Sequence, residues 1–213
     1  MVEQMAGSVI LVTARMFGRM STEATRRLEV AGCRLRFPTE RDRPLQDGDV
    51  RPLVDDVVAV IAGLEPWTDP LMASVPGLRL ICRFGVGYDS VDVAAATRRG
   101  ILVAITPAAN HTSVAEYTVA LMLAVMRRVA SQDAAAKRGQ WLPQPGPELR
   151  GRTLGIIGLG RVGREVADLA RAFAMRVIAH EIAPDPAFVA TRGIGLVDFE
   201  TLLREADIVT LHV

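Results

Sequence analysis

One glycine-rich segment has the residue types and spacing of a diphosphate-binding turn. Gly158–Gly163 reads G-L-G-R-V-G, which matches the pattern G-x-G-x-x-G. In such a turn Gly158 allows the chain to reverse tightly, Gly160 lets the backbone approach a diphosphate, and Gly163 lets a helix pack closely on a strand. The pattern alone is weak, because ordinary turns also produce it. Its weight depends on the elements on either side.

Those elements are the ones that a dinucleotide site requires. The sequence predicts an apolar strand over 153–157 and an amphipathic helix over 162–173, whose first N–H groups would face the phosphates. The next predicted strand leads to Glu181, which lies 18 residues after Gly163, close to the spacing of the acid that binds a ribose. A carboxylate there would repel a 2′-phosphate, so we expect NAD as the cofactor rather than NADP. The plainer alternative is a solvated glutamate at the end of a strand.

A second glycine turn follows a predicted strand in the first half of the chain. The segment Arg83–Asp89 reads R-F-G-V-G-Y-D, with Gly85 and Gly87 on either side of Val86. Ligands of open α/β sheets collect at the carboxyl ends of strands, and exposed N–H groups in such a turn can hold a carboxylate. From these residues alone, a carboxylate site and a plain tight turn carry equal weight.

Composition excludes several classes of protein. Of the 213 residues, 50% are hydrophobic and the formal net charge is +1, which argues against disorder and against binding to nucleic acid. Cys33 and Cys82 are far apart and lack metal-ligand spacing, so we expect no metal site and two buried thiols in a cytoplasmic protein. Residues 1–8 lack a signal-peptide pattern, and the longest apolar run, 119–126, is too short to cross a membrane.

Short apolar runs alternate with helical patterns along most of the chain. This alternation predicts an α/β fold made of doubly wound parallel sheets, in two domains comprising residues 1–106 and 107–213. The predicted strands are 9–12, 35–37, 57–61, 80–83, 101–105, 153–157, 176–179 and 208–213, and the predicted helices are 22–31, 69–74, 91–98, 162–173 and 199–205.

The connection between the domains carries one more predicted helix. Ser113 and Glu116 have the spacing of a capping box, which predicts a helix start there and an apolar helix reaching about Ala130. Because this helix is apolar nearly all round, we expect it to be buried in a domain or at a subunit contact. The segment 139–147 holds three prolines and two glycines and is predicted to form an extended arm.

In this order, these stretches resemble the D-isomer-specific 2-hydroxyacid dehydrogenases, and among them the phosphoglycerate dehydrogenases most. The stretches that carry the resemblance are Arg83–Asp89, Gly100–Pro107, Val114–Glu116, Leu154–Ala167 and Ala206–Val213. The resemblance implies a flavodoxin-like substrate domain, then a Rossmann NAD-binding domain that is incomplete at its C-terminal end. It implies an NAD-dependent oxidoreductase that moves hydride between nicotinamide and a D-2-hydroxy or 2-oxo acid, with the active site between the domains.

The resemblance also assigns roles to individual residues. Gly85, Val86 and Gly87 would contact the substrate carboxylate, and Val86 would also lie near the nicotinamide. The cofactor residues would be Gly158, Gly160, Arg161, Val162, Gly163, Glu181 and Val213, with Arg161 and Val162 at the diphosphate, Glu181 at the adenosine ribose and Val213 at the adenosine side. The long helix and the arm would help to form a homodimer.

The sequence departs from the family in one large respect. The reaction needs a base for the hydroxyl proton and a cation for the substrate oxygens. In the family these are a His with an acidic residue and an Arg, and all three lie beyond the position that matches Val213. We therefore expect no catalytic residue within this chain and no turnover by it alone. The sequence Ala62-Gly63 lacks the phosphate-binding Arg that phosphoglycerate dehydrogenases can carry nearby, so a phosphorylated substrate is in doubt.

The three histidines offer no replacement for the missing base. His111 lies at the domain crossing and could at most contact a substrate, while His180 and His212 are expected near the adenosine side, far from the hydride. Two other classes stay open from the sequence alone. The chain could be a non-catalytic NAD-binding module or an inactive fragment, and the family also includes transcriptional corepressors, although no basic or peptide-binding surface is evident.

Overall fold

A computed structural model describes residues 6–40, 42–43 and 45–213 of the chain. Residues 1–5, part of the segment considered for a signal peptide, lie outside the described residues. The chain divides into two compact units, Met1–Ala109 and Asn110–Val213. The predicted domain boundary lies slightly earlier, between residues 106 and 107.

The first unit is built on a five-stranded parallel sheet. Its strand order is β2-β1-β3-β4-β5, the order of flavodoxin-like folds, as predicted. The strands are β1 (Val9–Val12), β2 (Arg34–Arg36), β3 (Val57–Ala62), β4 (Leu80–Arg83) and β5 (Leu102–Ala104). In this order β1 and β3 are neighbours, so the chain reverses its direction of winding between them, and ligands of such sheets bind at the carboxyl ends beside this point.

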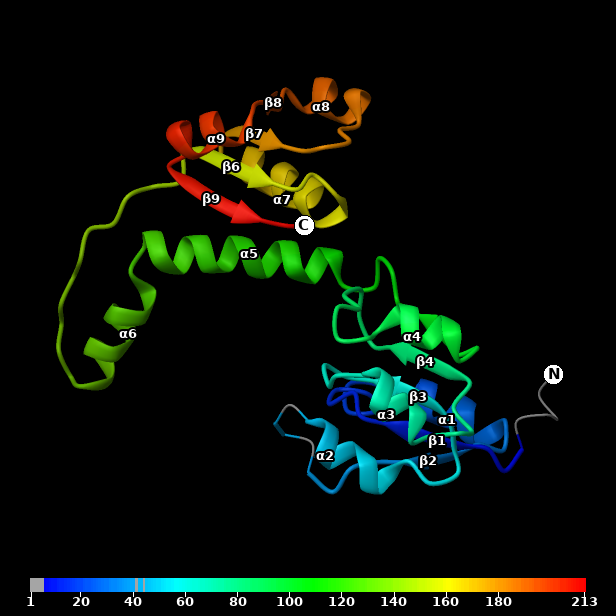
Figure 1. Ribbon diagram of the computed structural model, residues 1–213. Coiled ribbons are helices and arrows are strands. Elements are labelled where there is room, and N and C mark those ends of the chain that lie inside the picture. The colour runs from blue at the N-terminus through cyan, green and yellow to red at the C-terminus, as the bar shows by residue number, and fades with distance from the viewer. Residues whose placement is uncertain (1–5, 41, 44) are drawn as a thin grey trace. The chain divides into compact units, whose positions relative to one another are not determined.

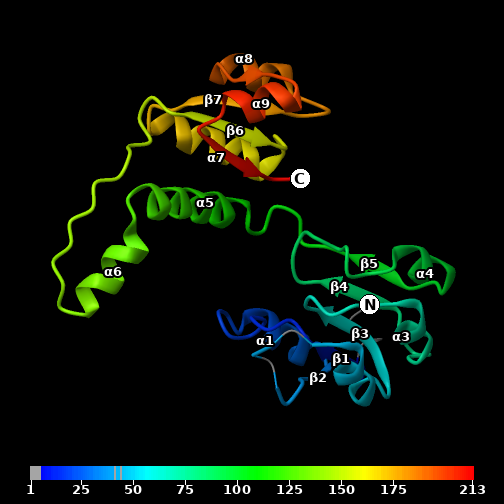
Figure 2. The ribbon, with the colours of Figure 1, turned by 60° about the vertical axis from the view of Figure 1, so that its left-hand side comes forward.

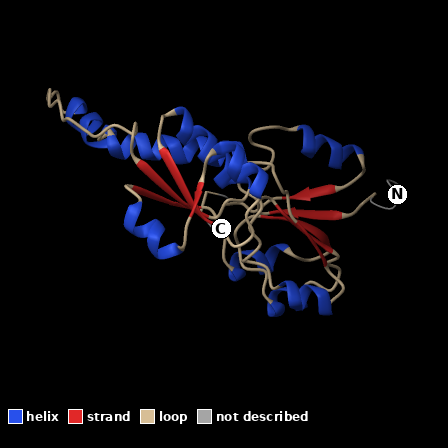
Figure 3. Ribbon diagram, turned by 90° about the horizontal axis from the view of Figure 1, so that it is seen from above, coloured by secondary structure: helices blue, strands red, loops and turns tan. Residues whose placement is uncertain are grey.

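Helices lie on both faces of this sheet (Figure 3). They are α1 (Glu23–Val30), α2 (Asp47–Val50), α3 (Asp69–Ala73) and α4 (Val93–Arg98), with a 3-10 turn at Arg51–Leu53. The core beneath them is mostly aliphatic, with the fully buried Trp67 as its largest side chain. The short helix α2 was not predicted, because four residues are too few to show a helical period.

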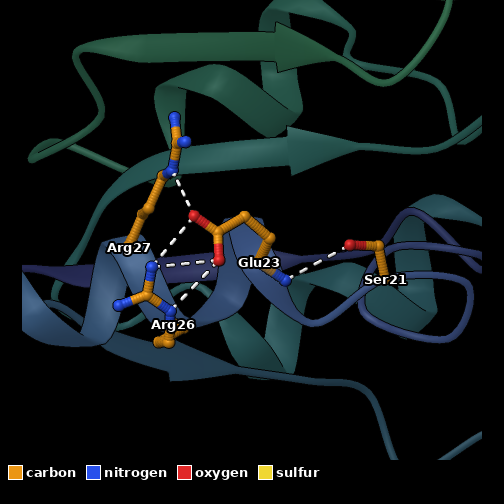
Figure 4. A network of polar contacts seen from close by, with 4 residues as sticks. All are labelled: Ser21, Glu23, Arg26 and Arg27. Atoms are coloured by element: carbon orange, nitrogen blue, oxygen red, sulfur yellow. Dashed lines mark hydrogen bonds and ion pairs between the residues drawn. The ribbon is translucent and has the colours of Figure 1, made fainter.

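The surface of α1 illustrates how the numerous arginines are used. Glu23 in the first turn pairs with Arg26 at 2.9 Å and with Arg27 at 2.8 Å, and its own N–H donates to Ser21 Oγ at 3.3 Å (Figure 4). Arg27, and after it Arg26, hold the pKa of the Glu23 carboxyl below its usual range. These pairs are solvent-exposed and support the helix locally.

The second unit contains a four-stranded parallel sheet (Figures 1 and 2). Its order is β8-β7-β6-β9, and if its strands are counted from β6 this is 3-2-1-4, the first four positions of the Rossmann order. The strands are β6 (Thr153–Ile157), β7 (Arg176–His180), β8 (Gly195–Leu196) and β9 (Ile208–Leu211). The predicted fold class is confirmed in both units.

The second unit has five helices: α5 (His111–Met126), α6 (Val129–Lys137), α7 (Arg161–Ala172), α8 (Pro186–Arg192) and α9 (Phe199–Glu205). Helix α6 follows α5 and lies away from the sheet (Figures 1 and 2). In both side views α5 and α7 lie on one face of the sheet, and α8 and α9 lie on the other (Figures 1 and 2). Helix α7 places Val166, Ala167 and Ala170 in the core against β6 and β7. Its strongly amphipathic pattern explains why this helix was predicted within one residue at each end.

Two predictions about the connecting helix are wrong. Helix α5 begins at His111, so Ser113 and Glu116 lie inside it and form no capping box. The helix also ends at Met126, because Arg128 takes a left-handed conformation (φ 54°), and α6 is a separate helix. Burial is confined to one side of α5, since Leu121 and Val125 are 48% and 74% exposed within this unit.

Smaller differences concern single residues and short elements. Cys33 is buried as expected, but Cys82 is half-buried, and neither cysteine is part of a disulfide. The short elements α8 and β8 were not predicted. Among the described residues, no helix has the length and apolar character needed to cross a bilayer.

Candidate functional site

The turn between β6 and α7 is shaped by its glycines. Gly158 has φ +90°, and a Cβ there would lie 2.4 Å from the carbonyl oxygen of His212. A Cβ on Gly163 would lie 2.1 Å from the carbonyl oxygen of Gly158, so any larger residue would force helix and turn apart. The tight turn and the close packing that the sequence predicted for these two positions are therefore both present.

Gly160 differs from the other two glycines because space surrounds it. No atom lies within 4 Å of the position that a Cβ would occupy, and the residue is exposed. Gly160 is the N-cap of α7 and provides no side chain to cap the helix. The first N–H groups of α7, which begins at the exposed Arg161 and the half-buried Val162, are therefore not capped by a side chain, and the positive end of the helix dipole lies beside this open space.

Glu181 lies beside this turn, directly after β7. Its Oε2 accepts a hydrogen bond from the N–H of Leu159 at 2.6 Å, and its Oε1 accepts one from the N–H of Ala183 at 3.0 Å. These N–H groups, Ala183 first and then Leu159, hold the pKa of Glu181 below its usual range. An ionised carboxylate offers about four acceptor positions, so lone pairs remain for two ribose hydroxyls.

The C-terminal residues also border the turn. The N–H of His212 donates to the carbonyl oxygen of Ile157 at 2.7 Å, and a side-chain carbon of Val213 lies 3.0 Å from the Cβ position of Gly158. The structure thus brings Val213, Gly158 and Glu181 to the same end of the sheet. His180 lies at this end too, with its ring edge-on to Phe199 at 5.9 Å.

The other histidines have local partners. His212 contacts Thr210 Oγ1 at 2.9 Å, and burial lowers the pKa of its imidazole. His111 lies 3.2 Å from the Glu165 carboxylate of α7, which also accepts from Thr112 at 3.1 Å. In the described part of the chain, no group of three or more His, Cys, Asp or Glu residues could hold a metal ion.

The glycine turn of the first unit follows β4. Gly85 has φ +153°, a conformation that favours glycine, and its carbonyl oxygen accepts from the N–H of Thr106 at 3.0 Å. Val86 is 44% exposed, and Gly87 is exposed as well. The turn therefore presents backbone to solvent at the carboxyl end of the sheet, within the first unit.

The structure adds a polar group that the sequence analysis did not single out. Thr13, Glu65 and Arg83 are buried, and they lie at the carboxyl ends of β1, β3 and β4. Glu65 is only 2% exposed and Arg83 only 8%. A signal was available in the sequence, because charged residues rarely occur at the buried end of an apolar strand without a partner or a function.

Comparisons with known proteins agree with this geometry. Residues 119–213 match the family described as "D-isomer specific 2-hydroxyacid dehydrogenase, NAD binding domain". A D-3-phosphoglycerate dehydrogenase of Archaeoglobus fulgidus is 43% identical over 145 residues, which are 67% of this chain and 28% of that protein. A glyoxylate reductase of Thermococcus litoralis is 39% identical over 152 residues, which are 67% of this chain and 46% of that protein.

A solved structure extends the similarity to the first unit. The D-lactate dehydrogenase of Aquifex aeolicus, solved with NAD and lactic acid, superimposes with a TM-score of 0.78 and 26% identity. The match covers 96% of this chain and 60% of that one. The chain therefore spans between about a quarter and three fifths of the length of these relatives.

Proposed function

We propose, from the premise that this chain belongs to the D-isomer-specific 2-hydroxyacid dehydrogenase family, that it binds NAD and a D-2-hydroxy or 2-oxo acid. NAD is the cofactor of this family's second domain, and the second unit has that domain's fold. The observation that carries the proposal is the open space at Gly160, in front of the uncapped N-terminus of α7.

The diphosphate of NAD would lie against this helix start. Gly160 leaves room for it, and the N–H groups of Arg161 and Val162 would donate to its oxygens. Gly158 and Gly163 would act indirectly, because they shape the turn and do not face the open space. The residues present thus fit the group that the family binds.

Glu181 would bind the adenosine ribose. Its carboxylate is held by the N–H of Leu159, which belongs to the glycine turn itself, so the acid is fixed at the turn before any ligand arrives. A 2′-phosphate would meet this ionised carboxylate, which supports NAD over NADP. Val213, beside Gly158, would border the adenosine side.

The glycine turn of the first unit would bind the acid's carboxylate. The half-buried Gly85 and the exposed Val86 and Gly87 lie at the carboxyl end of the sheet, where N–H groups can form an anion-binding nest. Bound NAD supplies a carbon that accepts hydride from C2 of the hydroxy acid. The residues assigned here bind and orient the two ligands. None of them is placed to take the hydroxyl proton, so we propose that these 213 residues bind both ligands without turning them over.

We also propose that copies of the chain pair through α5 and the arm that follows α6. Apolar side chains there are exposed within the second unit: Tyr117 at 65%, Val125 at 74% and Trp141 at 92%. Neither Cys33 nor Cys82 is part of a disulfide, which supports a reducing compartment such as the cytoplasm. Sedimentation velocity tests the pairing, and a Trp141→Ser variant that sediments like the unaltered chain would contradict the role of the arm.

Calorimetric titration of the chain with NADH and NADPH tests the cofactor assignment. We expect saturable binding of NADH and binding of NADPH that is at least roughly tenfold weaker, because the Glu181 carboxylate would repel the 2′-phosphate. No binding of either nucleotide, or tighter binding of NADPH, would contradict the proposal.

A further inference from the structure

The first unit contains a cavity at the carboxyl ends of β1, β3 and β4. Its volume is about 290 Å³, and apolar side chains such as Met16, Leu45 and Phe84 form much of its wall. Glu65 and Arg83 also line it, and both are more than nine-tenths buried. The cavity therefore combines an apolar wall with one buried acid and one buried base.

Half of the Glu65 carboxylate is fully engaged. Its Oε1 accepts from Thr13 Oγ1, from the N–H of Gly63 at 3.1 Å and from Trp67 Nε1 at 3.0 Å. Its Oε2 makes no hydrogen bond to any residue that the structure describes. Glu65 lines the cavity, so this second carboxylate oxygen remains able to accept a hydrogen bond from a ligand there.

Arg83 is the complementary group. Its Nη1 donates to the carbonyl oxygens of Phe84 at 2.6 Å and Ala62 at 3.5 Å, and its guanidinium lies against the backbone of Gly85. Its Nε is buried without an acceptor, and none of the described carboxylates lies within ion-pair distance of it. A buried guanidinium without an anion is costly, so this geometry calls for an anionic ligand.

Glu65 and Arg83 hold opposite sides of one peptide group. Glu65 accepts from the N–H of Gly63, while Arg83 donates to the carbonyl oxygen of Ala62, and these two atoms belong to the same peptide bond. Because the C=O and N–H of a trans peptide point in opposite directions, the acid and the base are separated. A ligand that satisfies both must carry an acceptor at one end and a donor at the other.

Building on the function proposed above, we propose that this cavity selects a monocarboxylate substrate whose tail carries a hydroxyl group. The carboxylate end lies at Arg83, next to the Gly85 turn, and the tail hydroxyl donates to Glu65 Oε2. A purely aliphatic tail offers no donor to Glu65 Oε2 and displaces water from it, which costs affinity. A phosphorylated tail brings negative charge to the Glu65 carboxylate.

Two further arginines line the cavity and could in principle favour a phosphate. Arg43 is engaged by Asp49 at 2.6 Å and by Glu40 at 3.3 Å, so its charge is already balanced. Arg15 donates to the carbonyl oxygen of Asp42 at 3.4 Å. Because both are exposed and engaged while Glu65 is buried, we expect Glu65 to decide between a hydroxyl and a phosphate.

The indole N–H of Trp67 provides a direct test. It donates to Glu65 at 3.0 Å, whereas the other tryptophan, Trp141, is 92% exposed in the second unit and serves as an internal control. In nitrogen-15 NMR spectra of the chain, D-glycerate should shift the Trp67 indole signal saturably and leave that of Trp141 in place. D-lactate, which lacks the tail hydroxyl, and 3-phospho-D-glycerate should each bind at least roughly tenfold more weakly.

Variants separate the two ends of the ligand. Glu65→Gln should lower the affinity for D-glycerate to that for D-lactate. It should also reduce the difference in affinity between D-glycerate and 3-phospho-D-glycerate. Arg83→Gln should lower the affinities for D-glycerate and D-lactate by the same factor, roughly tenfold or more. The matched control is Arg98→Gln, on the exposed face of α4 and outside the cavity wall, and it should leave both affinities unchanged.

The proposal is overturned if Trp67 does not respond to D-glycerate, if D-lactate binds equally well, or if the phosphorylated acid binds more tightly. The comparison of three ligands on the unaltered chain decides this even if a variant does not fold. NADH added to the same sample should separately shift the amide signals of Gly158–Gly163. If NADH shifts these signals but D-glycerate does not shift the Trp67 signal, only the cavity proposal is refuted. If NADH leaves the glycine amide signals unchanged, the cofactor assignment is refuted.

Discussion

Replacing Gly160 by Asp should separate the stability of the second unit from its ability to bind a dinucleotide. Gly160 has the extended conformation of an N-cap (φ −72°, ψ −159°), and no atom lies within 4 Å of an added Cβ. Asp is among the best N-cap residues, and its charge suits a helix N-terminus. We therefore expect Gly160→Asp to stabilise the unit by a few tenths to about 1 kcal/mol, which raises Tm by up to about 5 °C.

The same carboxylate would stand where the diphosphate is proposed to lie. Two like charges about 4 Å apart at an effective dielectric constant of about 20 repel by about 4 kcal/mol, which corresponds to roughly a thousandfold loss of affinity. A side chain in this space would also exclude the phosphate sterically. Binding and stability are thus expected to change in opposite directions.

Calorimetry with NADH, together with thermal unfolding followed by circular dichroism, measures both quantities. Gly48→Asp is the matched control, because Gly48 also has no atom within 4 Å of an added Cβ but lies in α2 of the first unit. The control should bind NADH like the unaltered chain. If Gly160→Asp keeps its NADH affinity, or loses affinity only because it unfolds, the placement of the diphosphate is wrong.

Four further predictions concern the same unit. In calorimetric titrations, Glu181→Ala should lower the affinity for NADH and reduce the difference in affinity between NADH and NADPH. Unchanged affinities for both nucleotides would show that this residue is not part of the site. Gly163→Ala should lower Tm, because a Cβ 2.1 Å from a backbone oxygen forces overpacking that costs about 1–3 kcal/mol, and an unchanged Tm would contradict the packing described. The purified chain should not oxidise NADH in the presence of hydroxypyruvate or 3-phosphohydroxypyruvate, and measurable loss of absorbance at the NADH band would disprove this. Asp198 caps α9 by accepting from the N–H of Thr201, and this bond, together with that from the Thr201 hydroxyl, holds the pKa of Asp198 below its usual range. Because the pKa is lower in the folded state, this stabilisation is complete above the unfolded pKa and is lost as the pH falls through the folded pKa. Asp198→Asn should therefore lower Tm at pH 7 and lower it progressively less as the pH falls.

The parts of the fold that follow a strong local period were predictable. Strands such as β1 and β4 are short apolar runs with defined ends, and α7 has one apolar face over three turns, so their ranges agree closely with the prediction. The glycine turn at Gly158–Gly163 was also predictable, because the G-x-G-x-x-G spacing marks positions where a side chain would clash with the backbone or fill the proposed diphosphate site.

Other features depend on contacts that local patterns do not encode. The break between α5 and α6 occurs at Arg128, a good helix former that is held in a left-handed conformation. Helix α8 was missed although Asp185 caps it and Pro186 opens it, which are recognisable start signals. The pairing of Glu65 and Arg83 around one peptide group depends on the alignment of β3 with β4, which only the folded sheet provides.

A crystal structure of the chain with NADH would show directly where the cofactor binds. We expect the diphosphate within hydrogen-bond distance of the first N–H groups of α7, beside Gly160, and the adenosine ribose hydroxyls on the Glu181 carboxylate. A nucleotide bound anywhere else, or a bound nucleotide whose ribose does not touch Glu181, would contradict this placement.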